Sequence, residues 1–308
     1  MSVLFTFPGQ GAQRPGMLHM LPDHPETSRT IAETVDALGE DPLQLDTADA
    51  FASSFAVQIC LLLAGVAMAR VLAAHGARPD MVAGLSIGAY PAAVVAGVLD
   101  YADAVRLVAR RGRLMDSRYP EGYGMAAIVG LDQGQLEPLI ARVHTRATPV
   151  YLANLNATRQ FVIAGAIEAL QMVMAMALPQ GATKAERLAV TVPSHCELFN
   201  DEATAMRVAF RSIALRRPQV MYLSSSAARA LSDPQRIGDD LADNLARQVH
   251  WHDTARLAWE RGARLAVEMP SGTVLTNLTA PVFVDGQAIS CDNTNLDTVV
   301  ALIARERR

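Results

Sequence analysis

The sequence predicts an α/β fold in which a small ferredoxin-like domain is inserted into a larger domain with a mostly parallel sheet. Apolar, strand-like segments alternate with helical patterns along most of the chain, which is typical of a parallel sheet covered by helices. Between residues 125 and 192 the order changes to β-α-β-β-α-β, the order of a ferredoxin-like unit. We therefore expect a large domain formed by residues 1–124 and 191–308, and a small domain formed by residues 125–190.

Each expected element follows from an apolar run and the residues that stop it. In the large domain we expect strands at Val3–Phe7, Met81–Ala83, Gln219–Leu223 and Arg264–Met269, and helices at Thr27–Leu38, Phe51–Ala74, Ile87–Gly97, Asp103–Met115, Glu197–Ser212 and from Thr273. In the small domain we expect strands at Met125–Val129, Val150–Ala153, Phe161–Ala164 and Arg187–Val192, and helices at Gln135–His144 and Ile167–Ala177. Residues 50–69 carry no charge and are long enough to cross a bilayer, but polar side chains interrupt them, so we expect a buried helix and no membrane partner.

Composition and charge exclude several functions. The formal net charge of -4 leaves no basic excess with which to bind phosphates, so nucleic acid is not an expected partner. The cysteines occur at spacings that suit neither a disulfide framework nor a metal, and the first residues lack a signal-peptide pattern, so we expect a cytoplasmic protein. His250 and His252 lie two residues apart, but no third ligand follows them, so we expect a packing or surface role and no metal.

Residues 84–88, Gly-Leu-Ser-Ile-Gly, match the pattern G-x-S-x-G between an apolar strand and a helical segment. On such a turn the hydroxyl of Ser86 projects from the edge of the sheet, and the flanking glycines let neighbouring backbone approach. The amide of Ile87, at the start of the helix, points to the place where an oxyanion develops during attack on a carbonyl. Ser86 is therefore the candidate nucleophile, and the alternative is a loop serine that caps a helix.

His195 is the candidate base because it follows a predicted strand that ends near the same edge of the sheet. Ser194 and Glu197 are spaced as a capping box, which predicts that a helix begins at His195. A helix N-terminus favours the neutral imidazole, which is the form that accepts a proton from serine. The alternative is a polar residue in the first turn of a helix.

Arg111 is the candidate site for a negative charge on a substrate. All of its helical neighbours at three and four residues are apolar, namely Leu107, Val108, Leu114 and Met115. This pattern predicts that Arg111 faces the core, where a guanidinium needs an anion and suits a carboxylate. From these residues alone, an internal Asp or Glu and a substrate carboxylate are equally open as partners.

Several short segments follow one another along nearly the whole chain. They are residues 7–13 (Phe-Pro-Gly-Gln-Gly-Ala-Gln), 84–88, 111–115 (Arg-Gly-Arg-Leu-Met), 120–122 (Pro-Glu-Gly), 125–128 (Met-Ala-Ala-Ile), 161–165 (Phe-Val-Ile-Ala-Gly) and 192–196 (Val-Pro-Ser-His-Cys). Together they resemble the malonyl-CoA:acyl-carrier-protein transacylase family. The resemblance implies a hydrolase-like α/β large domain with a ferredoxin-like small domain, and no bound cofactor. It also implies that Ser86 takes malonyl from malonyl-CoA and passes it to the thiol arm of an acyl carrier protein, with His195 as base and then acid and Arg111 on the malonyl carboxylate.

The resemblance implies three further site residues. The backbone amides of Gln10 and Ile87 are implied to form an oxyanion hole, and the backbone carbonyl of Asn244 to orient His195. The loop that contains Gln10 does not match a dinucleotide fingerprint, because the third glycine of that pattern would fall at Arg14.

Two segments depart from the usual family pattern. Leu85 and Ala89 replace a histidine and a glutamate in the serine turn, and residues 268–272, Glu-Met-Pro-Ser-Gly, replace a Gly-Pro-Gly turn. With these departures the chain most resembles the transacylase (epsilon) subunit of malonate decarboxylase, which implies a dedicated small carrier protein as acceptor and further subunits as partners. The alternatives are a transacylase of fatty acid or polyketide synthesis, a serine hydrolase or thioesterase, and a non-catalytic docking subunit. A hydrolase is disfavoured by the long segment after His195, since its histidine usually follows the last strand.

Overall fold

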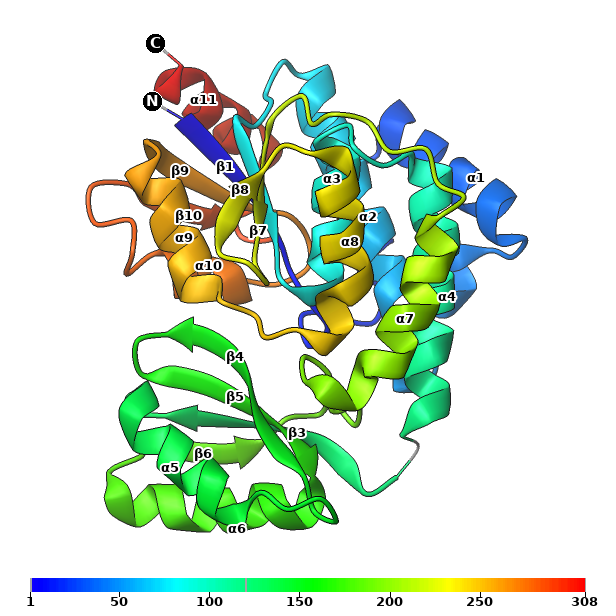
Figure 1. The fold of residues 1–308 in the computed structure, drawn as a ribbon. Coiled ribbons are helices and arrows are strands. Elements are labelled where there is room, and N and C mark those ends of the chain that lie inside the picture. The colour runs from blue at the N-terminus through cyan, green and yellow to red at the C-terminus, as the bar shows by residue number, and fades with distance from the viewer. Residues whose placement is uncertain (1, 120, 308) are drawn as a thin grey trace.

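The larger sheet contains six strands (Figure 1). They are β1 (Ser2–Phe7), β2 (Met81–Gly84), β7 (Met221–Ser224), β8 (Arg229–Leu231), β9 (Ala263–Glu268) and β10 (Gln287–Ser290). In this computed structural model, which describes residues 2–119 and 121–307, their order is β10-β9-β1-β2-β7-β8. All neighbours are parallel except β7 and β8, so the predicted mostly parallel sheet is confirmed. Pro120, from one of the segments that carry the family resemblance, lies outside the described residues.

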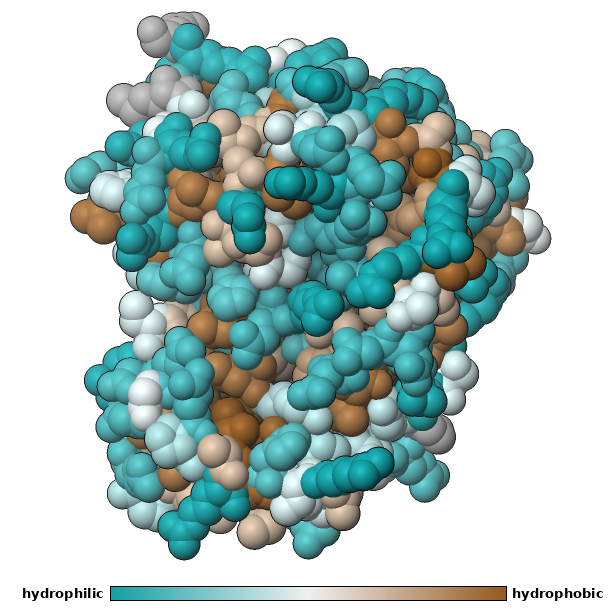
Figure 2. Space-filling model, in the orientation of Figure 1, coloured by the Kyte–Doolittle hydropathy of each residue, from teal (hydrophilic) through white to brown (hydrophobic). Residues whose placement is uncertain are grey.

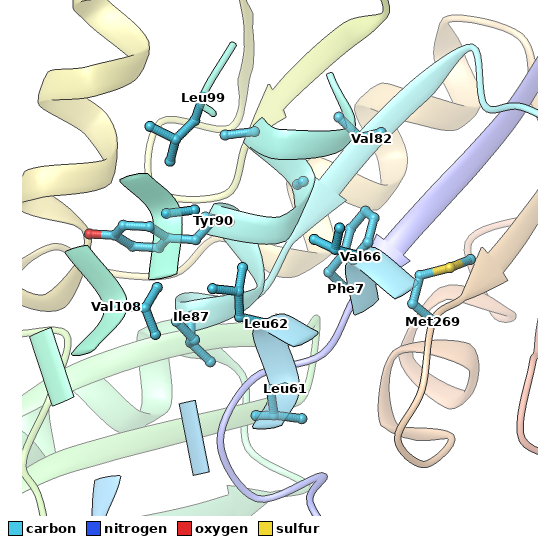
Figure 3. Packing of buried hydrophobic residues seen from close by; sticks show 14 of the residues in the cluster. Phe7, Leu61, Leu62, Val66, Val82, Ile87, Tyr90, Leu99, Val108 and Met269 are labelled. Atoms are coloured by element: carbon cyan, nitrogen blue, oxygen red, sulfur yellow. The ribbon is translucent and has the colours of Figure 1, made fainter. Parts of the chain in front are cut away.

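Helices pack on both faces of this sheet. They are α1 (Pro25–Leu38), α2 (Ser54–Ala74), α3 (Ala89–Val95), α4 (Tyr101–Arg118), α7 (Asn200–Phe210), α8 (Pro234–Asp243), α9 (Trp251–Glu260), α10 (Val274–Thr279) and α11 (Leu296–Glu306). Alternate residues of β1 point to opposite faces, so that Val3 and Phe5 belong to one apolar core and Leu4 to a second. Ile87, which follows the candidate nucleophile, lies among the side chains of the first core (Figure 3).

Helix α2 lies in the centre of the first core. Within residues 2–119 and 121–307 it is the one helix that is long and apolar enough to cross a membrane by length and composition. However, 89% of its apolar 18-residue window is buried inside the protein, as predicted for a core helix. The helix begins at Ser54, and a separate 3₁₀ turn occupies Ala50–Ala52 before it.

The smaller sheet is antiparallel. Its strands are β3 (Tyr123–Val129), β4 (Val150–Ala157), β5 (Gln160–Ala166) and β6 (Lys184–Arg187), in the order β4-β5-β3-β6, and its helices are α5 (Gln133–Val143) and α6 (Ile167–Ala177). The helices cover one face with an apolar core of their own, and the other face is turned toward the large unit (Figure 1). Apolar side chains appear along the junction of the two units on a surface that is otherwise mostly hydrophilic (Figure 2). The predicted β-α-β-β-α-β order is confirmed.

The predicted strand at residues 187–192 is wrong, since β6 ends at Arg187. Leu188 still donates its amide to the carbonyl oxygen of Met125 (2.9 Å), after which the chain leaves the sheet and returns to the large unit. The alternating apolar side chains of Leu188 and Val190 line a cavity between the units. Their spacing of two therefore reflects contact with that cavity and not pairing in a sheet.

A close approach of backbone segments fixes the turn after β2. A Cβ atom added to Gly88 would lie 2.0 Å from the carbonyl oxygen of Phe7. We therefore expect Gly88→Ala to lower the free energy of unfolding by about 2 kcal/mol or more. Urea denaturation measures the change, with Gly134→Ala as matched control, because a Cβ at Gly134 on α5 meets its nearest atom at 3.5 Å. Equal stability of the two variants would contradict the role given to this close approach.

Candidate active site

Ser86 lies at the turn that follows β2. It begins a 3₁₀ turn (Ser86–Gly88), which becomes the α-helix α3 at Ala89, so the helix predicted from Ile87 starts later and ends earlier than expected. The φ angle of Ser86 is +56°, in the left-handed region that residues other than glycine rarely adopt. A serine held in a strained strand-to-helix turn, and only 7% exposed, has the local geometry of a nucleophile elbow.

The imidazole of His195 lies next to Ser86. Its Nε2 is 2.8 Å from the Oγ of Ser86, and its Nδ1 is 2.9 Å from the carbonyl oxygen of Asn244 and 3.1 Å from that of Arg247. Carbonyl oxygens only accept hydrogen bonds, so in the neutral imidazole Nδ1 carries the proton and Nε2 accepts one from the serine hydroxyl. The structure thus brings together the predicted nucleophile and base, with the predicted carbonyl behind the ring.

The predicted capping box at Ser194 is wrong. His195 has a φ angle of +67°, and its amide donates to the carbonyl oxygen of Leu245 (2.7 Å). The first helical turn is the 3₁₀ turn Glu197–Phe199, which has no side-chain cap, and the Oγ of Ser194 lies 3.6 Å from the Sδ of Met125. A contact with a distant backbone segment therefore overrides the local Ser-x-x-Glu pattern.

Burial lowers the pKa of His195 from 6.5 to about 4, and the nearby charge of Arg111 acts in the same direction. We therefore expect an NMR titration to show a neutral ring at about pH 6 that gains its proton near pH 4. The unfolded chain takes up this proton at higher pH than the folded chain. The free energy of unfolding should consequently fall as the pH drops from about 6.5 to about 4. A titration midpoint of His195 near its ordinary pKa of 6.5 would contradict a buried ring beside the charge of Arg111.

The guanidinium of Arg111 is buried beside Ser86, with Nη2 3.2 Å from the Oγ of the serine. Its other partners are neutral: the Oε1 of Gln58 at 2.7 Å, the Oδ1 of Asn244 at 3.2 Å and the Sδ of Met115 at 3.3 Å. In the described part of the chain no carboxylate pairs with Arg111, and its Nε has no partner. Of the two partners left open by the sequence, the geometry therefore favours an anionic ligand over an internal Asp or Glu.

The loop after β1 carries Gln10 to the vicinity of Ser86. A Cβ added to Gly9 would lie 3.5 Å from the Cβ of Ser86, so this loop passes directly against the serine turn. Gln10 lines the same cavity as Ser86, while Ile87, the residue after Ser86, is fully buried. The two residues expected to supply oxyanion-hole amides are thus close to the serine, and their assignment to an oxyanion hole stays a prediction.

A cavity of about 240 Å³ between the two units is lined by Gln10, Ser86 and His195, and the small sheet forms its opposite wall. Asn154 and Asn156 of β4 and Gln160 of β5 line this wall. Both asparagines are more than nine-tenths buried, and within residues 2–119 and 121–307 their Oδ1 atoms have no hydrogen-bond partner. The sequence prediction missed them because it ended the strand at Ala153. The spacing of two between the asparagines was the available signal that both face one side.

The His250–His252 segment lies away from this cavity. His250 precedes α9 and donates its amide to the carbonyl oxygen of Ser225 (2.7 Å), while His252 is half-buried on α9. In the part of the chain that the structure describes, no group of three or more His, Cys, Asp or Glu side chains is placed to hold a metal ion.

Known proteins are similar to this chain in sequence and in fold. The family model of the acyl transferase domain matches residues 4–305. The chain belongs to the acyl transferase family. Its relatives include the malonyl CoA-acyl carrier protein transacylases of Escherichia coli O157:H7 (38% identical over 281 residues, 89% of this chain and 91% of the relative) and Haemophilus influenzae (35% identical over 295 residues, 94% of each). The solved structure of the transacylase from Coxiella burnetii has a TM-score of 0.93 and 30% identity, and covers 100% of this chain and 98% of that chain.

Membership of the acyl transferase family confirms the predicted fold class and the prediction that the chain is an acyltransferase enzyme. A further solved structure, with a TM-score of 0.92 and 33% identity, covers 98% of this chain and 100% of that chain. It shows a malonyl-transacylase in complex with its type II polyketide acyl-carrier protein. The acyl transferases named here do not support the finer resemblance to a malonate decarboxylase subunit.

Proposed function

We propose that this acyl transferase moves malonyl from malonyl-CoA to the thiol of an acyl carrier protein through an ester on Ser86. One observation carries the proposal: the Oγ of Ser86 lies 2.8 Å from the Nε2 of His195 and 3.2 Å from the Nη2 of Arg111. A nucleophile between a base and a buried cation suits an acyl group that ends in a carboxylate. The malonyl CoA-acyl carrier protein transacylases named above support the same assignment.

In the first half-reaction, the hydroxyl of Ser86 attacks the thioester carbonyl of malonyl-CoA while the Nε2 of His195 takes its proton. The carbonyl oxygen becomes an oxyanion, for which we assign the backbone amides of Gln10 and Ile87 as donors. When the C–S bond breaks, the sulfur of coenzyme A leaves with the proton that His195 held. The products are the malonyl ester on Ser86 and free coenzyme A.

The second half-reaction repeats these steps with a different thiol. The thiol of the carrier gives its proton to His195 and attacks the ester carbonyl, and the oxygen of Ser86 leaves and recovers the proton. Donor and acceptor both carry their sulfur at the end of an amide-bearing arm, as a thioester in the donor and as a thiol in the acceptor, so one cavity can serve both. The unpartnered Oδ1 atoms of Asn154 and Asn156 suit the N–H groups of such an arm.

The carrier of malonate decarboxylase is the second candidate acceptor. It rests on Leu85, on Ala89 and on the departure at residues 268–272. In the structure Glu268 is buried and accepts a hydrogen bond from the amide of Leu275 (3.0 Å), which lines the cavity. This departure therefore affects the wall of the cavity and leaves the nucleophile, base and cation in place. The relatives favour an acyl carrier protein as acceptor, which is why it is the first candidate.

The test is transfer of radiolabelled malonyl from malonyl-CoA to purified carrier proteins that carry or lack the thiol arm. We expect label on an acyl carrier protein with the arm and none on the same carrier without it. Label on the carrier of malonate decarboxylase alone would favour the second candidate, and rapid release of free malonate without a carrier would favour a hydrolase. Failure to move label to any carrier or to water would favour a docking subunit and overturn the proposal.

A further inference from the structure

We propose that the side chain of Asn244 is a positioning residue for Arg111, and that its neutral amide keeps the charge of Arg111 available for the malonyl carboxylate. This inference deepens the proposed function and rests on it. The family resemblance implies a role for the backbone carbonyl of Asn244 alone. The structure gives its side chain a separate partner, so one residue holds both the base and the cation.

Four buried residues form a closed circuit of hydrogen bonds. Asn244 lies in the 3₁₀ turn Asn244–Ala246 that follows α8 and is 1% exposed. Its carbonyl oxygen accepts from the Nδ1 of His195 at 2.9 Å, and its Oδ1 accepts from the Nη2 of Arg111 at 3.2 Å. The Oγ of Ser86 closes the circuit, because it contacts both the Nε2 of His195 and the same Nη2 of Arg111. The position of Asn244 therefore fixes the imidazole of His195 and the guanidinium of Arg111 relative to each other.

The charge of the circuit depends on the amide. The hydrogen-bond acceptors around Arg111 are neutral, including the Oε1 of Gln58 on the opposite side of the guanidinium. A carboxylate at position 244 would form a buried ion pair with Arg111 and compete with the carboxylate of the substrate. It would also favour the charged form of His195, which the positive charge of Arg111 now disfavours. An amide supplies an acceptor without either effect.

Only one orientation of the amide suits this circuit. With Oδ1 toward Arg111, an acceptor faces an N–H donor, whereas the reversed amide would place two donors against each other. The Nδ2 of Asn244 and the Nε of Arg111 are then buried donors, and neither has a partner in the part of the chain that the structure describes. Buried donors without acceptors are costly. A group rich in acceptors, such as a carboxylate, would satisfy donors of this kind.

Two variants with the same number and branching of side-chain heavy atoms separate the roles of the two oxygens, because both keep the backbone carbonyl that contacts His195. Asn244→Leu removes the acceptor for Arg111, and Asn244→Asp replaces it by a charge. Steady-state rates are measured with malonyl-CoA and with acetyl-CoA, whose acyl group lacks the second carboxylate. Each kcat/KM is followed over the acidic pH range in which protonation of His195 lowers the rate. Asn200→Asp, the same change at an exposed residue of α7, is the matched control.

For Asn244→Leu we expect the kcat/KM for malonyl-CoA to fall about tenfold relative to that for acetyl-CoA. The pH at which activity falls on acidification should stay unchanged in this variant. For Asn244→Asp we expect the KM for malonyl-CoA to rise about tenfold or more. Because a carboxylate favours the charged form of His195, the loss of activity on acidification should begin at a higher pH. The Asn200→Asp control should show neither change. If the aspartate variant fails to fold, the leucine variant decides the question.

Equal losses with malonyl-CoA and acetyl-CoA in Asn244→Leu would overturn the inference, because they would indicate a general structural role. An unchanged preference for malonyl-CoA in a folded Asn244→Asp would overturn it as well. Intact mass of the wild-type protein separates this failure from that of the proposed function. If the wild type forms no malonyl ester, the proposed function is wrong. If the wild type forms the ester but the Asn244 variants keep the wild-type preference, only the inference on Asn244 is wrong.

Discussion

Replacing Ser86 by alanine is expected to lower the kcat/KM for malonyl transfer by about 10⁴-fold or more. The variant lacks the oxygen that forms the ester, while His195 and Arg111 keep their remaining contacts with Asn244. Since the hydroxyl is small and lies in a cavity, the stability of the protein should change little. Transfer of labelled malonyl to a carrier with the thiol arm measures the rate, and thermal unfolding measures the stability.

Ser194→Ala is the matched control for this loss. Ser194 is also buried and lines the same cavity, but its Oγ lies 3.6 Å from the Sδ of Met125 and is not placed against the imidazole. We expect this variant to retain transfer within about tenfold of the wild type. Comparable residual activity in Ser86→Ala and Ser194→Ala would show that Ser86 is not the nucleophile.

Arg111→Ala is expected to lower the kcat/KM for malonyl-CoA by about 10²-fold to 10³-fold and that for acetyl-CoA far less. The reason is that acetyl has no second carboxylate to pair with the guanidinium. The substitution removes a buried charge whose partners are all neutral, so it leaves no opposite charge unpaired in the protein. Competition between the two thioesters in one reaction mixture measures the change in preference directly.

Arg110→Ala provides the control for this prediction. Arg110 precedes Arg111 on α4 but is exposed to solvent, so its removal should alter neither rate nor preference. Arg111→Lys keeps the charge without the planar fork and should fall between the wild type and Arg111→Ala for malonyl-CoA. Equal losses for malonyl and acetyl in Arg111→Ala would refute the assignment of Arg111 to the carboxylate.

Short-range patterns predicted the parts of the site that depend on one element. The burial of Arg111 followed from four apolar helical neighbours, because side chains three and four residues apart share a helix face. The turn at Ser86 followed from Gly84 and Gly88, which lie between a strand and a helix and lack a Cβ where backbone segments approach closely. The fold class followed from the order of elements, which the two sheets reproduce.

Features that depend on contacts between distant segments were not predictable in this way. The left-handed conformation of His195 accompanies a hydrogen bond to the backbone of Leu245, 50 residues later in the chain, while the local pattern indicated a helix cap. Asn154 and Asn156 continue β4 through irregular pairing with β5, where the apolar pattern had already ended. Polar residues in a strand indicate a functional site only when the sheet is known to face a cavity.

The identity of the acylated atom tests the central claim most directly. After incubation with malonyl-CoA, intact-protein mass spectrometry and peptide mapping locate the acyl group. The buried thiol of Cys196, next to the base, is the control position, and burial raises its pKa to about 12, which disfavours the reactive thiolate. We expect one malonyl group per chain, carried by the oxygen of Ser86 and lost on addition of a thiol-bearing carrier. An unmodified protein, or a malonyl group on any other residue, would contradict the assignment of Ser86 as the nucleophile.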